Sequence, residues 1–214
     1  MNYDEYYKIN ENVFGKEPER ILVKFSNLIS KEHPVLDIGS GQGRNTVYLS
    51  KSGYSVDAID TSLFSIQLLE ELKETEKLNF RTFHSDYKNY IGNKNYSAVL
   101  LFGLMQILDW EEIDLLIKKI SGWLKAGGLL FITSFTTSDE SYNIIMKDSK
   151  KIGKNSYLKE DGKIRTFFEP GELKKLFPEY KILHYWEGTG PEHRHGNSPV
   201  ERHALVEAVF QRLE

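Results

Sequence analysis

Residues 34–45 read PVLDIGSGQGRN, and this stretch decides the fold of the chain around it. The apolar run at residues 35–38 predicts a short buried strand, and residues 44–51 show the apolar spacing of a helix. Three alternating glycines connect the two, and glycine permits both a tight turn with positive φ and a close approach of the backbone to a ligand. A strand, a glycine turn and a helix in this order present backbone N–H groups to a bound molecule.

The spacing of the glycines separates several kinds of ligand-binding turn. The dinucleotide fingerprint G-x-G-x-x-G requires glycine at its sixth position, where this sequence has Arg44. The G-K-[ST] ending of a phosphate-binding P-loop is also absent. The pattern that remains is an acid, Asp37, followed at alternate positions by Gly39, Gly41 and Gly43.

The composition is typical of an ordinary globular domain. The chain has 214 residues, of which 40% are hydrophobic and 28% charged, and its net charge of −3 argues against a nucleic-acid partner. It contains no cysteine, which excludes disulfides and thiolate chemistry. No apolar run approaches the roughly 20 residues of a membrane span, and the polar first residues do not resemble a signal peptide. We therefore expect one cytoplasmic domain over residues 1–214 without membrane contacts, and nothing in the sequence indicates an oligomeric state.

Strand-like and helix-like segments alternate along most of the chain, which predicts a parallel, doubly wound α/β sheet. A final pair of strand patterns closes the sequence. Beyond the first strand and helix, the expected strands are residues 54–60, 78–84, 96–102, 129–135, 180–187 and 204–210. The expected helices cover residues 18–29, 63–77 and 110–123, with another beginning near Pro170.

The glycine motif closely resembles motif I of the class I S-adenosylmethionine (SAM)-dependent methyltransferases. The resemblance extends over roughly residues 18–212. It implies a doubly wound, mostly parallel, seven-stranded Rossmann-like sheet with an antiparallel C-terminal strand. It also implies that the glycines pass beneath the amino-acid part of the cofactor and that Asp37 faces its ammonium group. The cofactor contacts implied at this turn are Asp37, Gly39, Ser40, Gly41, Gly43, Arg44 and Asn45.

The residues after the motif are most similar to the tellurite-resistance and thiopurine branch of that family. The similarity lies in the Arg44-Asn45 ending, in Tyr48-Leu49 and in the sequence GYSV at residues 53–56. Members of this branch methylate small soft nucleophiles such as thiols or metalloid oxyanions. Ser40 departs from the branch, which often has cysteine there.

Three further places in the sequence match cofactor contacts of the family. Asp60 ends the second strand, where an acid can accept hydrogen bonds from two ribose hydroxyls. Asp60, Thr61 or Ser62 can equally serve as the N-cap of the next helix, and we expect Thr61 or Ser62 to do so. By the same resemblance, Asp86 accepts from the adenine amino group and Tyr87 lies against the adenine ring, although Asp86 also suits a plain turn. Phe102 ends the fourth strand, and Gly103 begins the segment that lines the transfer chamber in the family; both are expected to contact the cofactor.

Three segments are expected to cover the cofactor side of the sheet. Residues 1–33 are predicted to form an N-terminal helical cover in which Tyr3, Tyr6 and Tyr7 either fold over the cofactor or pack on the helix at residues 18–29. Residues 136–168 form a long substrate-side connection, part of which we expect to act as a flap. A short helix could begin at residues 138–141 and run through Met146, and the lysine-rich stretch from Lys147 to Lys163 is expected to be solvated. Residues 188–203 connect the last two strands and are the other candidate substrate-side loop.

His193 and His195 in that last loop are the candidate catalytic residues. In an extended backbone they point the same way, so either could contact the acceptor or accept its proton near neutral pH. The same spacing could chelate a metal with His184 or His203, but methyl transfer needs none and we assign no metal site. The remaining alternative is a solvated surface loop.

The function implied by the resemblance is transfer of the SAM methyl group to a small-molecule acceptor, with SAM as the cofactor. Two alternatives stay open. One is a module that binds SAM without catalysis, as a sensor or as part of a complex. The other is a nicotinamide-dependent dehydrogenase, which Arg44 opposes.

Overall fold

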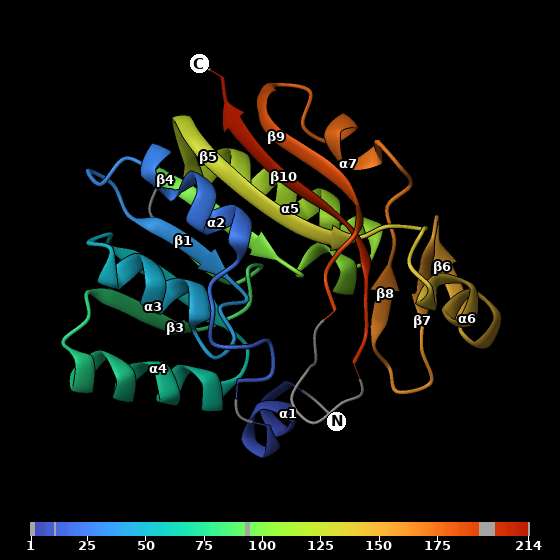
Figure 1. Cartoon of the computed structure of the whole chain (residues 1–214), viewed down its shortest axis with the longest axis horizontal. Helices are drawn as coiled ribbons and strands as arrows, with labels where there is room; N and C mark the ends of the chain where they lie inside the picture. The colour runs from blue at the N-terminus through green and yellow to red at the C-terminus, as the bar shows by residue number, and fades with distance from the viewer. Residues whose placement is uncertain (1–2, 11, 93–94, 193–199, 214) are drawn as a thin grey trace.

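The computed structural model describes residues 3–10, 12–92, 95–192 and 200–213. Seven strands form the central sheet in the order β3-β2-β1-β4-β5-β10-β9 (Figure 1). Strands β1 to β5 pair in parallel, whereas β10 pairs antiparallel with both β5 and β9. The predicted sheet with its antiparallel C-terminal strand is therefore confirmed. Its strands are β1 (Val35–Ile38), β2 (Val56–Asp60), β3 (Phe80–His84), β4 (Tyr96–Phe102), β5 (Leu124–Phe135), β9 (Tyr180–Thr189) and β10 (Ala204–Arg212).

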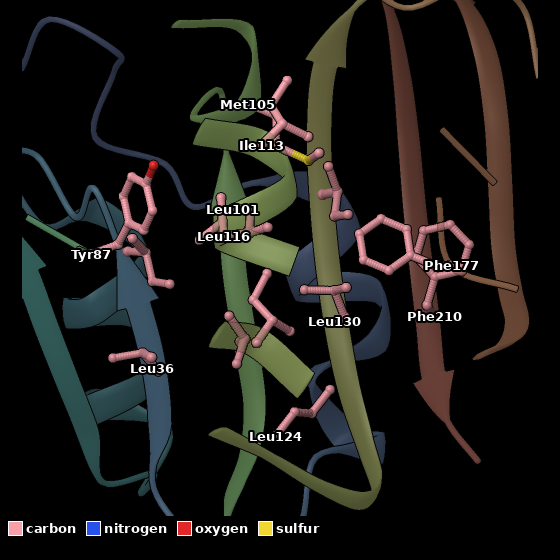
Figure 2. Packing of buried hydrophobic residues seen from close by; sticks show 14 of the residues in the cluster. Leu36, Tyr87, Leu101, Met105, Ile113, Leu116, Leu124, Leu130, Phe177 and Phe210 are labelled. Carbon is pink, nitrogen blue, oxygen red and sulfur yellow. The ribbon is translucent and has the colours of Figure 1, made fainter. Parts of the chain in front are cut away.

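Helices cover both faces of this sheet and bury one apolar core on each. On one face, α5 packs Ile113, Leu116 and Ile120 onto the central strands, and Figure 2 shows part of this core. On the other face, Leu22, Leu49 and Leu69 of three helices lie against β1 and β2. The helices are α1 (Tyr3–Ile9), α2 (Arg20–Phe25), α3 (Arg44–Lys51), α4 (Leu63–Glu76), α5 (Trp110–Trp123), α6 (Ser141–Asp148) and α7 (Glu172–Lys175), with 3-10 turns η1 (Ser26–Leu28) and η2 (Met105–Ile107).

Local sequence signals set where the helices begin. At the start of α5, the Asp109 side chain accepts from the backbone N–H of Glu112, and the Glu112 side chain accepts from that of Asp109. Ser62 caps α4 by accepting from the backbone N–H of Ser65, as expected of Thr61 or Ser62. The helix expected over residues 18–29 is shorter, because the chain tightens into η1 after Phe25.

The connection at residues 136–168 is more ordered than we expected from its lysines. It contains α6 and a small antiparallel sheet of β6 (Lys150–Gly153), β7 (Ser156–Leu158) and β8 (Ile164–Thr166). The expectation of a solvated stretch is wrong for β7, because the buried hydroxyls of Ser156 and Thr166 bond to each other and Tyr157 is buried under Tyr142. Most of β6 is exposed, as expected. Thr166 also donates to the carbonyl of Leu108, which ties this sheet to the end of η2.

None of the helices in the described ranges combines the length and apolar character that a membrane crossing would require.

Candidate active site

A cavity of about 670 Å³ opens where the parallel strands β1 to β5 end. This is the edge at which α/β sheets bind ligands. All of the predicted cofactor residues line the cavity except Ser62, which caps α4 instead. Those lining it are Asp37, Gly39, Ser40, Gly41, Gly43, Arg44, Asn45, Asp60, Thr61, Asp86, Tyr87, Phe102 and Gly103.

The glycine turn has the backbone geometry that its sequence predicts. Gly39, Gly41 and Gly43 have φ values of 73°, 52° and 88°, a region that residues with side chains rarely adopt. A Cβ atom on Gly43 would lie 2.2 Å from Cδ2 of Leu69, and one on Gly41 would lie 3.1 Å from the Tyr7 hydroxyl. The turn is therefore pressed against α4 on one side and α1 on the other.

Asp37 is a buried acid at the end of β1, with 2% of its surface exposed. Its Oδ2 accepts a hydrogen bond from the Thr46 hydroxyl at 2.6 Å. Burial raises the pKa of Asp37 to about 6, and the nearby Asp60 adds to this effect. An acid in this position needs a positive partner to be stable in its charged form.

Asp60 connects the glycine turn to the start of α4. Its Oδ2 accepts from the backbone N–H of Gly41 and its Oδ1 from that of Ser62, both at 2.8 Å. Burial raises the pKa of Asp60, although these two N–H groups favour the charged form. Each carboxylate oxygen has a further lone pair, so these bonds leave acceptor capacity for a ligand hydroxyl.

Asp86 and Tyr87 follow β3 and have structural partners as well as places on the cavity wall. Asp86 Oδ1 accepts from the backbone N–H of Asn89 at 2.8 Å, the turn role that the sequence also allowed. The Tyr87 hydroxyl donates to the carbonyl of Glu112 at 3.1 Å. Figure 2 shows Tyr87 at the margin of the core near Leu36.

The segment before β1 is fastened to the cavity at two points. Asp4 Oδ1 accepts from the Phe64 N–H and the Ser62 hydroxyl, which docks α1 on the first turn of α4. Gln42, inside the glycine turn, accepts from the Val13 N–H and donates to the carbonyl of Asn10. As a result Tyr3, Tyr6 and Tyr7 all line the cavity, and α1 packs on α4 rather than on α2.

Arg44 and Asn45 hold the chain just before α2. Arg44 forms an ion pair with Glu19, and Asn45 accepts from the backbone N–H of Glu19 at 2.9 Å. Their polar groups are thus engaged within the protein, although both side chains reach the cavity wall. The predicted cofactor role of these two residues stays a prediction.

At the far end of the cavity, His203 lines the wall and the buried Asp139 lies beside it, and neither was among the predicted catalytic or cofactor residues. Asp139 accepts from the Ser141 and Ala204 N–H groups, and its Oδ2 lies 3.0 Å from Nδ1 of His203. Burial acts to raise the pKa of Asp139, but hydrogen bonds from His203 and Ser141 outweigh it, so the pKa is lowered. The signal for this pair was weak, because its members are 64 positions apart and only the β5–β10 pairing brings them together.

Arg165 also lines this end, from β8. Its position was not predictable while β8 itself was expected to be a loop.

His193 and His195 lie outside the described residues, so their proposed roles stay predictions. Of the two histidines considered as further metal ligands, His203 is next to Asp139, and His184 packs against Phe25 of α2. The described part of the chain contains no group of three or more side chains suited to hold a metal ion.

The sheet order, the glycine turn and the two buried acids together define a class I SAM-dependent methyltransferase. The family model described as tellurite resistance protein TehB matches residues 4–203, and the chain belongs to this family. The predicted class is therefore confirmed.

Two comparisons with TehB of Haemophilus influenzae agree with this assignment. The curated probable SAM-dependent methyltransferase TehB (strain 10810) is 29% identical over 161 residues, which are 75% of this chain and 50% of that protein. The chain thus spans half the length of that curated relative. The crystal structure of H. influenzae TehB superposes with a TM-score of 0.73 at 25% identity, over 99% of this chain and 68% of the other. A SAM-dependent methyltransferase from Methanosarcina mazei shares the fold, with a TM-score of 0.75 at 22% identity over 92% of this chain and 99% of the other.

The cavity suits the cofactor of this class. SAM carries an ammonium and a sulfonium group, and the end of the cavity nearest the glycine turn has two buried acids. Side chains at the glycine positions would narrow the space beside Tyr7 and Leu104. The buried Ser40 hydroxyl lines the same space and has no hydrogen-bond partner among the described residues. A bound ligand would supply one.

Proposed function

We propose that this protein transfers the methyl group of SAM to a small-molecule acceptor through a soft nucleophilic atom, such as a thiol sulfur or a metalloid oxyanion. The observation that carries the proposal is the shape of the cavity. One continuous space joins the glycine turn and its buried acids to a second end lined by Phe135, Ile145 and Leu205. A cofactor and a small acceptor can therefore meet inside a single pocket.

The first end of the cavity suits the proposed cofactor roles. Asp37 would face the ammonium group, because it is the buried acid directly before the turn. Asp60 would accept from the ribose hydroxyls beside Gly41, and Asp86 with Tyr87 would contact the adenine at the end of β3. We propose the single domain over residues 1–214 as the unit that performs this reaction, in the cytoplasm and without a nucleic-acid partner.

When bound, SAM supplies a methyl group that is already activated by its positive sulfur. The protein then mainly positions the acceptor and excludes water. The three tyrosines of α1 and the apolar residues after β4 suit this task, since both groups line the cavity. An acceptor that is anionic at neutral pH needs no base, whereas a protonated one does, and we propose His193 or His195 for that role.

A screen with methyl-labelled SAM and a panel of thiols, selenite, tellurite, amines and phenols tests this proposal. We expect label transfer to a soft acceptor. The double variant His193→Ala/His195→Ala should lower turnover on that acceptor and leave SAM affinity nearly unchanged. SAM binding without transfer to any of these acceptors would contradict the proposal and favour a non-catalytic SAM-binding module. Normal turnover by the double variant would show that neither histidine contributes to the reaction.

A further inference from the structure

The basic side chains that line the cavity are almost all paired. Six basic side chains face it from the described residues, and five of them lie beside a carboxylate. These pairs are Arg44 with Glu19, Lys88 with Glu112, Lys159 and Lys163 with Asp161, and His203 with Asp139.

Arg165 is the sixth, and it has no carboxylate or hydrogen-bond partner among the described residues. The Tyr3 hydroxyl, whose pKa is raised by burial, is near enough to influence Arg165, and so are three carboxylates, those of Asp139, Asp161 and Glu201. Each carboxylate is engaged elsewhere: Asp139 and Glu201 lie on either side of His203, and Asp161 lies beside the two lysines.

The surroundings of Arg165 fix its guanidinium group without neutralising it. Its Cζ lies 5.2 Å from the ring centre of Phe135, a cation–π contact that uses none of the five N–H donors. Burial lowers the pKa of Arg165, as expected for a cation removed from water. A half-buried cation of this kind is most stable when a ligand supplies the missing anion.

Apolar side chains line this end of the cavity beside the charged ones. Phe135 pairs across the sheet with Leu205, and Ile145 of α6 lines the same end of the cavity. A bare inorganic oxyanion would neutralise Arg165 but leave this apolar surface uncovered. An acceptor with an apolar body and a carboxylate would satisfy both, because the planar guanidinium fork matches a carboxylate in two parallel hydrogen bonds.

We propose that Arg165 binds the carboxylate of a small organic acid whose apolar part lies against Phe135 and Leu205, and that such acids are the methyl acceptors. This inference rests on the proposed function and narrows its acceptor to organic acids that carry the soft nucleophile. Asp37, Asp60 and Asp86 then face the cofactor at one end, and Arg165 faces the acceptor at the other.

The test is calorimetric titration of the full chain, saturated with the product S-adenosylhomocysteine, with benzoate as the probe. Benzamide serves as the neutral analogue of the same shape, and selenite as the inorganic anion. We expect saturable benzoate binding that weakens about tenfold or more in Arg165→Gln, with benzamide and selenite binding far more weakly. Lys163→Gln is the matched control, since Lys163 lines the same cavity but is paired with Asp161, and it should leave benzoate binding unchanged.

The other outcomes are distinct. Equal binding of selenite and benzoate, or equal benzoate affinity in wild type and Arg165→Gln, would overturn the proposal. Weaker S-adenosylhomocysteine binding in Arg165→Gln would also overturn it, because Arg165 would then pair with the cofactor's own carboxylate. Failure of wild type to bind S-adenosylhomocysteine would refute the proposed function itself. If Arg165→Gln does not fold, Arg165→Lys keeps the charge, loses the planar fork, and should still bind benzoate less tightly.

Discussion

At the scale of single residues, the sequence predicted the site best at the glycine turn, where the residue types themselves dictate the backbone conformation. The three alternating glycines could be predicted to form a tight turn, and all three have positive φ. Asp37 could be predicted to lie beside them, since it comes two positions before the first. Its strongly raised pKa could not be predicted, because it depends on complete burial by segments distant in sequence.

The raised pKa of Asp37 gives a prediction for the variant Asp37→Asn. The folded protein holds this proton more tightly than the unfolded chain does, so the free energy of unfolding of the cofactor-free protein should fall as pH rises from about 4 to 6. Above pH 6 the buried charge persists, and Asp37→Asn should be more stable than wild type by on the order of 2 kcal/mol. Asparagine can still accept the Thr46 hydrogen bond.

The same substitution should weaken SAM binding, because the ammonium group loses its charged partner. Wild-type affinity should fall as pH drops through about 6, while the affinity of Asp37→Asn should be weak and flat from pH 5 to 7. Urea unfolding and calorimetry at several pH values measure the two effects. A variant that is less stable at pH 7.5, or that binds SAM as tightly as wild type, would contradict this reading of Asp37.

At the scale of elements, the strands were easier to predict than the segments that cover them. The central strands are continuous apolar runs whose pattern does not depend on neighbours. The small sheet of β6, β7 and β8 is short and lysine-rich, and it exists because buried groups such as Thr166 and Tyr157 find partners across it. Helix α1 likewise shows no strong helical pattern, and its position depends on the bonds of Asp4 to the start of α4.

Removing those bonds should release α1 from the cavity. In Asp4→Ala the Phe64 N–H and the Ser62 hydroxyl lose their acceptor, so Tyr7 should leave the glycine turn more often. We expect faster hydrogen exchange across residues 3–9 and a SAM affinity several-fold lower. Asp4→Asn keeps an acceptor oxygen and should retain most of both properties. Unchanged exchange and affinity in Asp4→Ala would show that α1 is held by its apolar contacts alone.

At the scale of the whole molecule, the topology places the proposed cofactor site and the proposed acceptor site at different parts of the sheet. Asp37 and Asp60 lie at the ends of β1 and β2, and Asp86 follows β3; all three belong to the cofactor end. The antiparallel strand β10 and the added sheet of β6 to β8 bring His203 and Arg165 to the other end (Figure 1). The first arrangement follows from strand order and could be predicted from the sequence, whereas the second required contacts between segments that share no local pattern.

The central claim is that this cavity is a SAM site, and the most direct test is calorimetric titration of one protein with SAM and with NAD. The account predicts saturable SAM binding and none of NAD, because Arg44 replaces the glycine that a pyrophosphate-binding turn requires. Asp60→Ala should weaken SAM by about 10- to 100-fold, while the exposed Asp114→Ala should not. Binding of NAD in place of SAM, or a SAM affinity indifferent to Asp60→Ala, would contradict the account.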